Sequence, residues 1–163
     1  MSRGRVVALD LGEKRIGVAI SDPDGVLASP YSTIDRSGDL ARDHREIFSA
    51  VADVGAVLVV VGMPLSLSGA RGPAAVATDK EVTQLRKALP VPVEIQDERL
   101  TTVSAARSMT AAGISSKRQR RGGRIDQEAA AVLLQSWLDS QRRSKDMGPP
   151  SATGLRRQNE GRS

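Results

Sequence analysis

The sequence contains no cysteine, which excludes disulfide bonds, thiolate zinc sites and thiol nucleophiles. Aromatic residues are almost as scarce: one Phe, one Tyr and one Trp are too few for base-stacking platforms that bind single strands. No apolar run approaches the roughly 20 residues of a membrane span, and the N-terminus lacks an apolar signal segment. We therefore expect a soluble, cytoplasmic protein that does not bind membranes.

The net charge of +5 is unevenly distributed along the 163 residues. Residues 141–163 contain six basic and two acidic side chains, and so carry +4 of this charge. Their Ser, Gly, Pro and Arg content predicts a basic, disordered C-terminal tail. Residues 1–140 have the length of one domain. Because this domain is nearly neutral, any affinity for nucleic acid has to come from local basic patches.

Hydrophobic patterns and turn residues predict an α/β protein. Strand-like segments are expected at residues 5–11, 15–22, 26–33, 56–61 and 91–98, the third at a sheet edge because of Pro30. Helical spacing is expected at residues 39–53 and 73–89, in a short segment ending at Gly113, and at residues 125–139. Right-handed crossovers would combine these strands into a mixed five-stranded sheet, three antiparallel plus two parallel, with helices on both faces.

Asp10 is an acidic residue in an otherwise apolar strand, VVALDL, just before a turn at Gly12. An unpaired ionised carboxylate in such a place costs several kcal/mol. Asp10 therefore either has a partner, such as the N–H groups of the turn, or holds a metal. The C-terminal ends of the first, fourth and fifth strands should meet at one edge of the sheet. There Asp10 can be joined by Glu98, or its neighbour Asp97, and by Asp126.

Such a cluster of like charges is tolerated mainly where divalent cations bind. Magnesium suits the site, because it prefers oxygen ligands and keeps water and phosphate oxygens in its shell. Two ions about 4 Å apart would activate a water on one side of a phosphodiester and stabilise the leaving oxygen on the other. The pattern thus predicts nuclease chemistry.

Four blocks of the sequence, spread over the predicted domain, resemble the YqgF/RuvX family of ribonuclease H-like proteins. They are ALDLGEKRIGVAISD at 8–22, VGMPLSLSGARGP at 61–73, DERLTTVSA at 97–105 and RIDQEAAAVLLQSWLD at 124–139. The resemblance implies a ribonuclease H-like fold and a cytoplasmic nuclease that trims the 5′ end of pre-16S ribosomal RNA. Some similar proteins are assigned Holliday junction resolvase activity.

Carried over by motif, the resemblance implies that Asp10 bridges two ions of Mg²⁺ or Mn²⁺. It implies Glu98 as the second ligand and Asp126 as the third. Side chains alternate along a strand, so only one of Asp97 and Glu98 faces the metal site. Alternation alone does not decide between them, because it leaves open which face carries Asp10. The resemblance selects Glu98.

Several basic residues are candidates for nucleic-acid binding, each with a structural alternative. Lys14 and Arg15 follow Asp10 and either meet a phosphate or are solvated turn charges. Arg99 contacts the nucleic-acid backbone or pairs with an acid, and Arg71 belongs to a loop, 65–72, with the composition of a substrate-gripping segment. A further basic cluster next to Asp126 is formed by Lys117, Arg118, Arg120, Arg121 and Arg124.

His44 and Trp137 lie on helical stripes, and we interpret both as structural rather than functional.

The partner we expect is structured RNA or branched DNA, bound by a monomer or a weak homodimer. A four-way DNA junction resolvase would need two active sites and hence a dimer. A non-catalytic factor that binds ribosomal RNA is a third possibility. A sugar-kinase or actin-like ATPase is a fourth, but these clamp nucleotide between two such domains and this chain has room for one.

Overall fold

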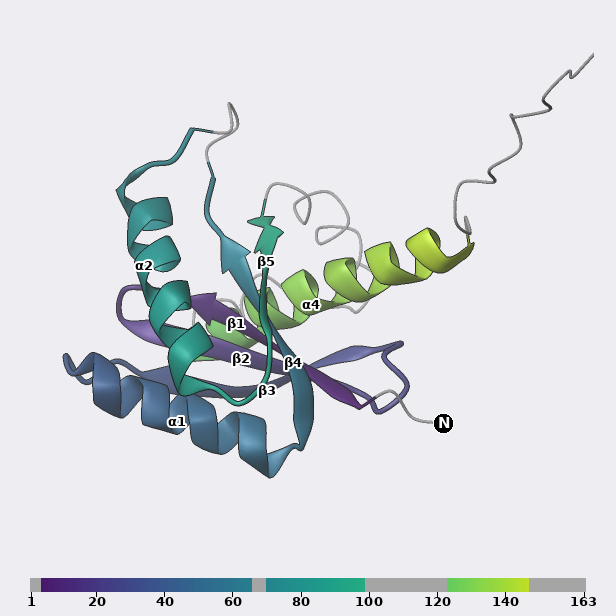
Figure 1. Cartoon of the computed structure of the whole chain (residues 1–163), viewed down its shortest axis with the longest axis horizontal. Coiled ribbons are helices and arrows are strands. Elements are labelled where there is room, and N and C mark those ends of the chain that lie inside the picture. The colour runs from purple at the N-terminus through teal and green to yellow at the C-terminus, as the bar shows by residue number, and fades with distance from the viewer. Residues whose placement is uncertain (1–3, 66–69, 99–122, 147–163) are drawn as a thin grey trace, which may run out of the picture.

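The computed structural model describes residues 4–65, 70–98 and 123–146, the side chains of residues 123–126 excepted. Its centre is a five-stranded sheet in the order β3-β2-β1-β4-β5 (Figure 1). The strands are β1 Arg5–Leu11, β2 Arg15–Ser21, β3 Ala28–Asp35, β4 Ala56–Met63 and β5 Val93–Asp97. The first three form an antiparallel meander, whereas β4 runs parallel to β1 and β5 parallel to β4. The predicted mixed sheet is confirmed, with β3, which contains Pro30, at one edge.

Two strands start later than predicted, and β2 and β4 end at Ser21 and Met63 instead of residues 22 and 61. Strand β3 starts at Ala28, two residues late, because the Asp22 carboxylate accepts hydrogen bonds from the N–H groups of Val26 and Leu27 and holds both in the preceding turn. Strand β5 starts at Val93, because Pro92 has no N–H to donate to the sheet. The carbonyl of Pro92 still accepts a hydrogen bond from Val59 N.

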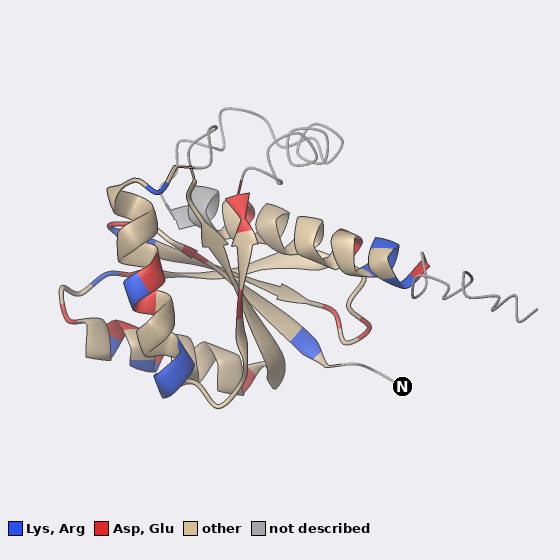
Figure 2. Ribbon diagram, turned by 45° about the horizontal axis from the view of Figure 1, so that its top comes forward, with Lys and Arg blue, Asp and Glu red and all other residues tan. Residues whose placement is uncertain are grey.

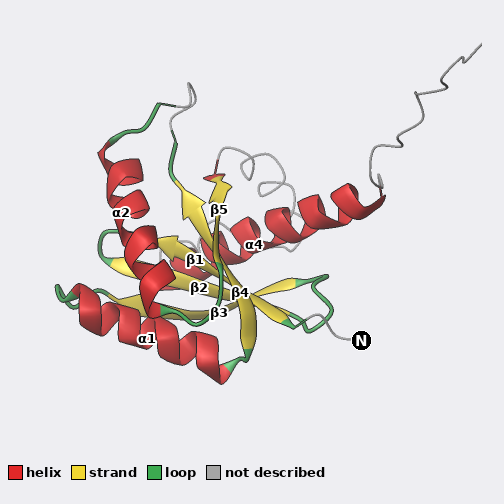
Figure 3. Cartoon of the chain, viewed as in Figure 1, coloured by secondary structure: helices red, strands yellow, loops and turns green. Residues whose placement is uncertain are grey.

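The helices cover both faces of the sheet (Figures 1 and 3). Helices α1 (Leu40–Asp53) and α2 (Pro73–Ala88) pack on one face, and the long helix α4 (Gly123–Asp146) crosses the other. Alternation along the strands divides the core accordingly. Val7 and Leu9 of β1 belong to the core under α1 and α2. Val6 and Ala8 belong to the core under α4. Within the described ranges, no helix combines the length and apolar content that crossing a bilayer requires.

Local signals fix the ends of the first two helices. Asp39 caps α1 by accepting hydrogen bonds from the N–H groups of Ala41 and Arg42, at 3.0 and 3.4 Å. Gly55 follows α1 with φ +63°, a conformation that L side chains rarely adopt. Pro73 stands at the start of α2, where its missing N–H costs nothing.

Helix α4 is longer at both ends than predicted. It begins at Gly123 instead of residue 125 and ends at Asp146 instead of residue 139. The prediction of a disordered tail from residue 141 is therefore wrong for residues 141–146, which are helical. The rest of that tail lies outside the described residues, as does the predicted short helix that ends at Gly113.

His44 and Trp137 have the structural roles predicted for them. His44 is 7% exposed and its Nε2–H donates to Glu81 Oε1 at 3.0 Å. Trp137 packs against the core under α4, and its Nε1–H donates to Glu94 Oε2 at 3.2 Å. Both side chains therefore connect elements that are distant in the sequence.

Candidate active site

Asp10 lies near the C-terminal end of β1, on the face of the sheet that α4 covers. Ala8 packs in the core under α4 and Leu9 in the core under α1 and α2, so alternation places Asp10 on the same side as Ala8. The three parallel strands β1, β4 and β5 end at one edge of the sheet, as predicted. Figure 2 shows the acidic end of β5 at this edge.

Glu98 directly follows β5 and turns toward the same face. Val93 packs under α1 and α2, so Ile95 and Asp97 share that side of the strand, whereas Glu94 contacts Trp137 of α4. The Glu98 carboxylate lies over Gly62 of β4 and beside Leu133 of α4. Glu98, not Asp97, therefore shares the face of Asp10. That Glu98 rather than Asp97 binds a metal stays a prediction, with which this direction of the side chain agrees.

The carboxyl groups at this edge influence one another electrostatically. Burial raises the pKa of the Glu98 carboxyl above its usual range, and the negative charges of Asp10 and then Asp97 raise it further. Like charges at close range favour protonation of one partner unless a cation compensates them. A cation bound between Asp10 and Glu98 would therefore reduce the repulsion between their carboxylates.

Helix α4 begins at this edge of the sheet and runs away from it. Leu133 approaches Gly62 near the end of β4, whereas Trp137, one turn later, contacts Glu94 at the start of β5. The N-terminal turn of α4 consequently lies toward the C-terminal ends of β1 and β4, as Figure 1 also shows. Asp126 belongs to that turn, although the atoms of its side chain fall outside the described part of the structure.

The donor set fits a hard divalent cation. Asp10 and Glu98 offer carboxylate oxygens, which Mg²⁺ and Mn²⁺ prefer. Among the described side chains, no three acidic, His or Cys residues form a metal-binding group, so a third ligand has to come from Asp126 or from beyond the described residues. Glu128, two residues after Asp126, has one buried carboxylate oxygen without a hydrogen-bond partner in the described structure. Sequence analysis missed Glu128, because nothing in a helical pattern distinguishes it from a solvated acid.

The predicted basic residues occupy different parts of this edge. Arg15 pairs with Asp35 at 3.5 Å, and Arg71 pairs with Asp79 at 3.7 Å, both on the surface. Lys14 is exposed in the turn between β1 and β2. Exposed ion pairs of this kind contribute little to stability, so both arginines can exchange their partner for a phosphate at low cost.

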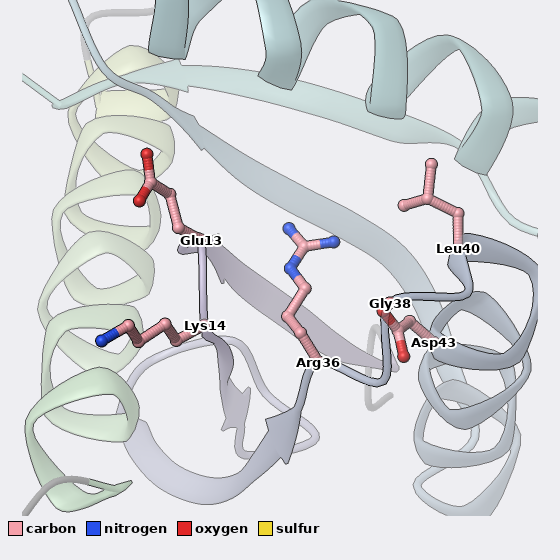
Figure 4. A pocket seen from close by; sticks show the side chains of 6 residues that line it. All are labelled: Glu13, Lys14, Arg36, Gly38, Leu40 and Asp43. Atoms are coloured by element: carbon pink, nitrogen blue, oxygen red, sulfur yellow. The ribbon is translucent and has the colours of Figure 1, made fainter.

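Lys14 also borders an open pocket of about 380 Å³ between the β1–β2 turn and α1 (Figure 4). The pocket is lined by Glu13, Lys14, Arg36, Gly38, Leu40 and Asp43. Arg36 already has partners within the protein. Its Nη1–H donates a hydrogen bond to the Glu81 carboxylate, and its Nε–H donates one to the carbonyl of Gly12. In Figure 4 the side chain of Lys14 points away from those of Arg36 and Asp43, which leaves Lys14 as the lining cation available to a ligand at the edge.

The remaining predicted binding residues fall wholly or partly outside the described structure. Arg99, Lys117, Arg118, Arg120 and Arg121 lie outside the described residues, and Arg124 is placed only by its backbone in the first turn of α4. Of this basic cluster, the structure places only the backbone of Arg124, at the end of α4 that lies toward Asp10.

Comparison with known proteins identifies a family for nearly the whole domain. Residues 4–140 match the family model described as "RuvX: Holliday junction resolvase". A protein of Rhodococcus opacus is 49% identical over 150 residues, which cover 90% of this chain and 83% of the relative. One of Streptomyces coelicolor is 44% identical over 156 residues, covering 95% and 90%. Both relatives are named "Putative pre-16S rRNA nuclease".

The fold has a solved counterpart. RuvC of Thermus thermophilus, in complex with a Holliday junction substrate, superposes with a TM-score of 0.55 at 12% identity and covers 86% of this chain and 96% of that chain. At this identity the likeness concerns the fold. The chain therefore has the ribonuclease H-like α/β fold of RuvC, which confirms the predicted fold class.

Proposed function

The chain belongs to the RuvX family, and we propose that it is a metal-dependent nuclease that hydrolyses phosphodiester bonds in the 5′-end processing of pre-16S ribosomal RNA. Cleavage of nucleic acid is the activity that the family description and the names of the relatives have in common. The choice of ribosomal RNA, and hence a role in ribosome biogenesis in the cytoplasm, follows the relatives, which are close to half identical over most of the chain.

The proposed catalytic residues are Asp10, Glu98 and Asp126, which would hold Mg²⁺ or Mn²⁺, with two ions when substrate is bound. Bound ions of this kind supply an activated water and compensate the charge on the leaving oxygen. Asp10 contributes from the central strand, where it pairs with Gly17 of β2 and the residue before it, Leu9, pairs with Val61 of β4. Glu98 contributes from the C-terminal end of β5, and Asp126 from the first turn of α4.

Nucleic acid would lie along the same edge. Lys14, Arg15 and Arg71 are the described basic residues that we assign to its phosphates, together with Arg99 and the cluster of Lys117, Arg118, Arg120, Arg121 and Arg124. Such contacts position the backbone without reading its sequence. Specificity for precursor RNA would then depend on the shape of the substrate. We infer a monomer or a weak homodimer, since the proposed ligands all come from one sheet edge of a single chain.

One observation carries the proposal more than any other: Asp10 and Glu98 come from different strands and share one face of the sheet, where burial and then the negative charge of Asp10 raise the pKa of the Glu98 carboxyl. A protein that used this edge only to bind RNA would gain nothing from opposing two acids to a polyanion. The cluster of carboxylates therefore favours the proposal of metal-dependent hydrolysis over that of simple RNA binding.

The test compares cleavage of a pre-16S ribosomal RNA fragment and of a four-way DNA junction, each with magnesium and with chelator. Wild type should cut the RNA only with magnesium, and Asp10→Asn should bind the RNA but not cut it. The control variant is Asp53→Asn at the exposed end of α1, which should cut as wild type does. If wild type cuts neither substrate, or Asp10→Asn cuts as fast as wild type, the proposal is wrong.

A second candidate function is resolution of four-way DNA junctions. The family description and the RuvC fold favour it, because RuvC has the same architecture and is seen in complex with a Holliday junction. Cleavage of the junction but not of the RNA, by a dimer in solution, would support this alternative. Binding of RNA without cleavage of either substrate would instead identify a non-catalytic assembly factor.

A further inference from the structure

Gly62 separates Asp10 from Glu98 on the face of the sheet that α4 covers. Leu9 of β1 pairs with Val61 of β4, so Asp10 and Gly62 are each the next residue along neighbouring strands. Val60 packs in the core under α4, and alternation places Gly62 on the same side as Val60. The line from β1 to the end of β5 on this face therefore passes over Gly62.

The space above Gly62 is occupied by the side chain of Glu98. A Cβ atom built at Gly62 would lie 2.8 Å from Glu98 Oε1, 3.1 Å from Leu133 Cδ2 and 3.2 Å from Glu98 Cγ. The first of these distances is shorter than real Cβ contacts allow. Glu98 consequently fills the volume in which any other residue at position 62 would place its side chain.

The backbone at Gly62 gives no other reason for a glycine. It lies inside β4, and the described glycines with positive φ are Gly4, Gly25, Gly38 and Gly55. An extended strand accepts any L residue except proline, and glycine in a strand interior weakens it, often where something has to approach the backbone closely. Here the group that approaches is a carboxylate.

We propose that Gly62 is a positioning residue, whose missing side chain lets the Glu98 carboxylate cross β4 and share a cation with Asp10. This inference rests on the proposed function, because it concerns the same metal site. Glu98 starts from the end of β5, two strands away from Asp10, and neighbouring strands are roughly 4.8 Å apart. When the Glu98 carboxylate bends over β4, its distance from Asp10 becomes shorter. A methyl group at position 62 would deflect the carboxylate and prevent this approach.

The structure predicts how the protein responds to a methyl group at position 62. Glu98 Oε1 is the end of a flexible side chain, so it can rotate away without unfolding the sheet. Leu133 Cδ2 has to give by a few tenths of an ångström. Gly62→Ala should therefore fold, and lose cation affinity because one ligand has moved. Displacing groups that orient metal ligands typically weakens metal binding by roughly 10- to 100-fold.

The experiment titrates wild type, Glu98→Gln and Gly62→Ala with Mn²⁺ and follows free Mn²⁺ by electron paramagnetic resonance. We expect at least a roughly tenfold weaker affinity for Gly62→Ala, close to that of Glu98→Gln. The matched control is Gly55→Ala at the opposite end of β4, where the positive φ strains the backbone but nothing lies within 4 Å of the new methyl group. It should lower the melting temperature and bind Mn²⁺ as wild type does.

A double variant separates positioning from packing. Gly62→Ala combined with Leu133→Ala removes the apolar contact at 3.1 Å but keeps the one with the carboxylate at 2.8 Å. It should still bind Mn²⁺ weakly, even if Gly62→Ala alone fails to fold. Wild-type affinity in either Gly62 variant would overturn the inference and leave the proposed function intact. Failure of wild type to bind Mn²⁺ would overturn both.

Discussion

Glu81 of α2 is a buried acid with two basic partners, Arg36 and His44. Its carboxylate receives two hydrogen bonds from Arg36, at 2.8 and 2.9 Å, and one from His44 at 3.0 Å. Arg36 also donates to the carbonyl of Gly12 at 2.9 Å, in the turn that follows Asp10. Glu81 thereby connects α2 and α1 to the turn beside the active site.

We predict that Glu81→Ala lowers the free energy of unfolding by about 3 kcal/mol, because it leaves the largely buried guanidinium of Arg36 without its partner. Asp79→Ala, on the same helix, is the control. It removes an exposed pair with Arg71 and should cost less than about 1 kcal/mol. Urea denaturation of the three proteins measures both effects. Equal losses for the two variants would contradict the role given to Glu81.

The same carboxylate makes stability depend on pH. Burial raises the pKa of Glu81, but the hydrogen bonds from Arg36 and His44 and their positive charges outweigh it, so the pKa lies below 4.5. A lowered pKa in the folded state means that this stabilisation is complete above 4.5 and is lost as the pH falls through the folded pKa. Below pH 4.5, Glu81→Gln should therefore show a weaker decline in melting temperature than wild type. Parallel declines would exclude Glu81 as a cause.

Single residues were the least predictable part of the site. Asp10 was recognisable because an acid stood in an apolar strand. The residues alone did not decide between Asp97 and Glu98. Strand β1 is apolar on both faces, so alternation alone could not show which face of the sheet carried Asp10. The packing of Ala8 under α4 and of Val93 under α1 and α2 shows which of the two shares the face of Asp10. The role of Gly62 was not predictable either. A glycine whose missing side chain leaves room for a residue distant in the sequence produces no local sequence pattern.

Helix ends were predictable where a cap or a glycine marked them. Asp39 caps the start of α1 and Gly55 follows its end, and both residue types are common at these positions. The C-terminal end of α4 was not predictable, because residues 141–146 are polar and resemble a solvated tail. In the structure they continue a helix, supported by an ion pair between Arg142 and Asp139 and a hydrogen bond from the Ser144 hydroxyl to the Ser140 carbonyl. Gln, Arg and Lys are good helix formers, and an existing helix is cheap to extend.

For the first helix we predict that Asp39→Ala lowers the free energy of unfolding by about 1 kcal/mol, because two N–H groups of α1 lose their acceptor. Asp53→Ala, at the other end of the same helix, removes a negative charge from the negative end of the helix dipole and should be neutral or slightly stabilising. Chemical denaturation distinguishes the two. A larger loss for Asp53→Ala would contradict the assignment of the cap.

The arrangement of the whole sheet followed from the order of the elements. Three strands joined by tight turns form a meander, and two helix-linked crossovers add parallel strands on one side. This order alone brings the ends of β1, β4 and β5 together. The basic residues that precede α4 lie within ten residues of Asp126 in the sequence of a molecule whose net charge is only +5.

This charge distribution predicts a salt dependence of RNA binding. Replacing Lys117, Arg118, Arg120 and Arg121 together by serine should reduce the slope of log affinity against log salt by about 3, at roughly 0.7 for each phosphate that is no longer neutralised. The control replaces Arg42 and Arg45, exposed on α1 across the sheet, and should leave the slope unchanged. Fluorescence anisotropy with a precursor RNA fragment at several salt concentrations measures the slopes. Identical slopes for the two variants would refute the binding role of the cluster.

The central claim is that a divalent cation binds where Asp10, Glu98 and the first turn of α4 meet. The most direct measurement is the broadening of backbone amide signals in the nuclear magnetic resonance spectrum of the wild-type chain by substoichiometric Mn²⁺. The amides of Asp10, Gly62 and Glu98 should broaden first, and those of residues 50–53, at the far end of α1, should stay sharp. Broadening that begins elsewhere, or that persists unchanged at these positions in Asp10→Asn, would contradict the account.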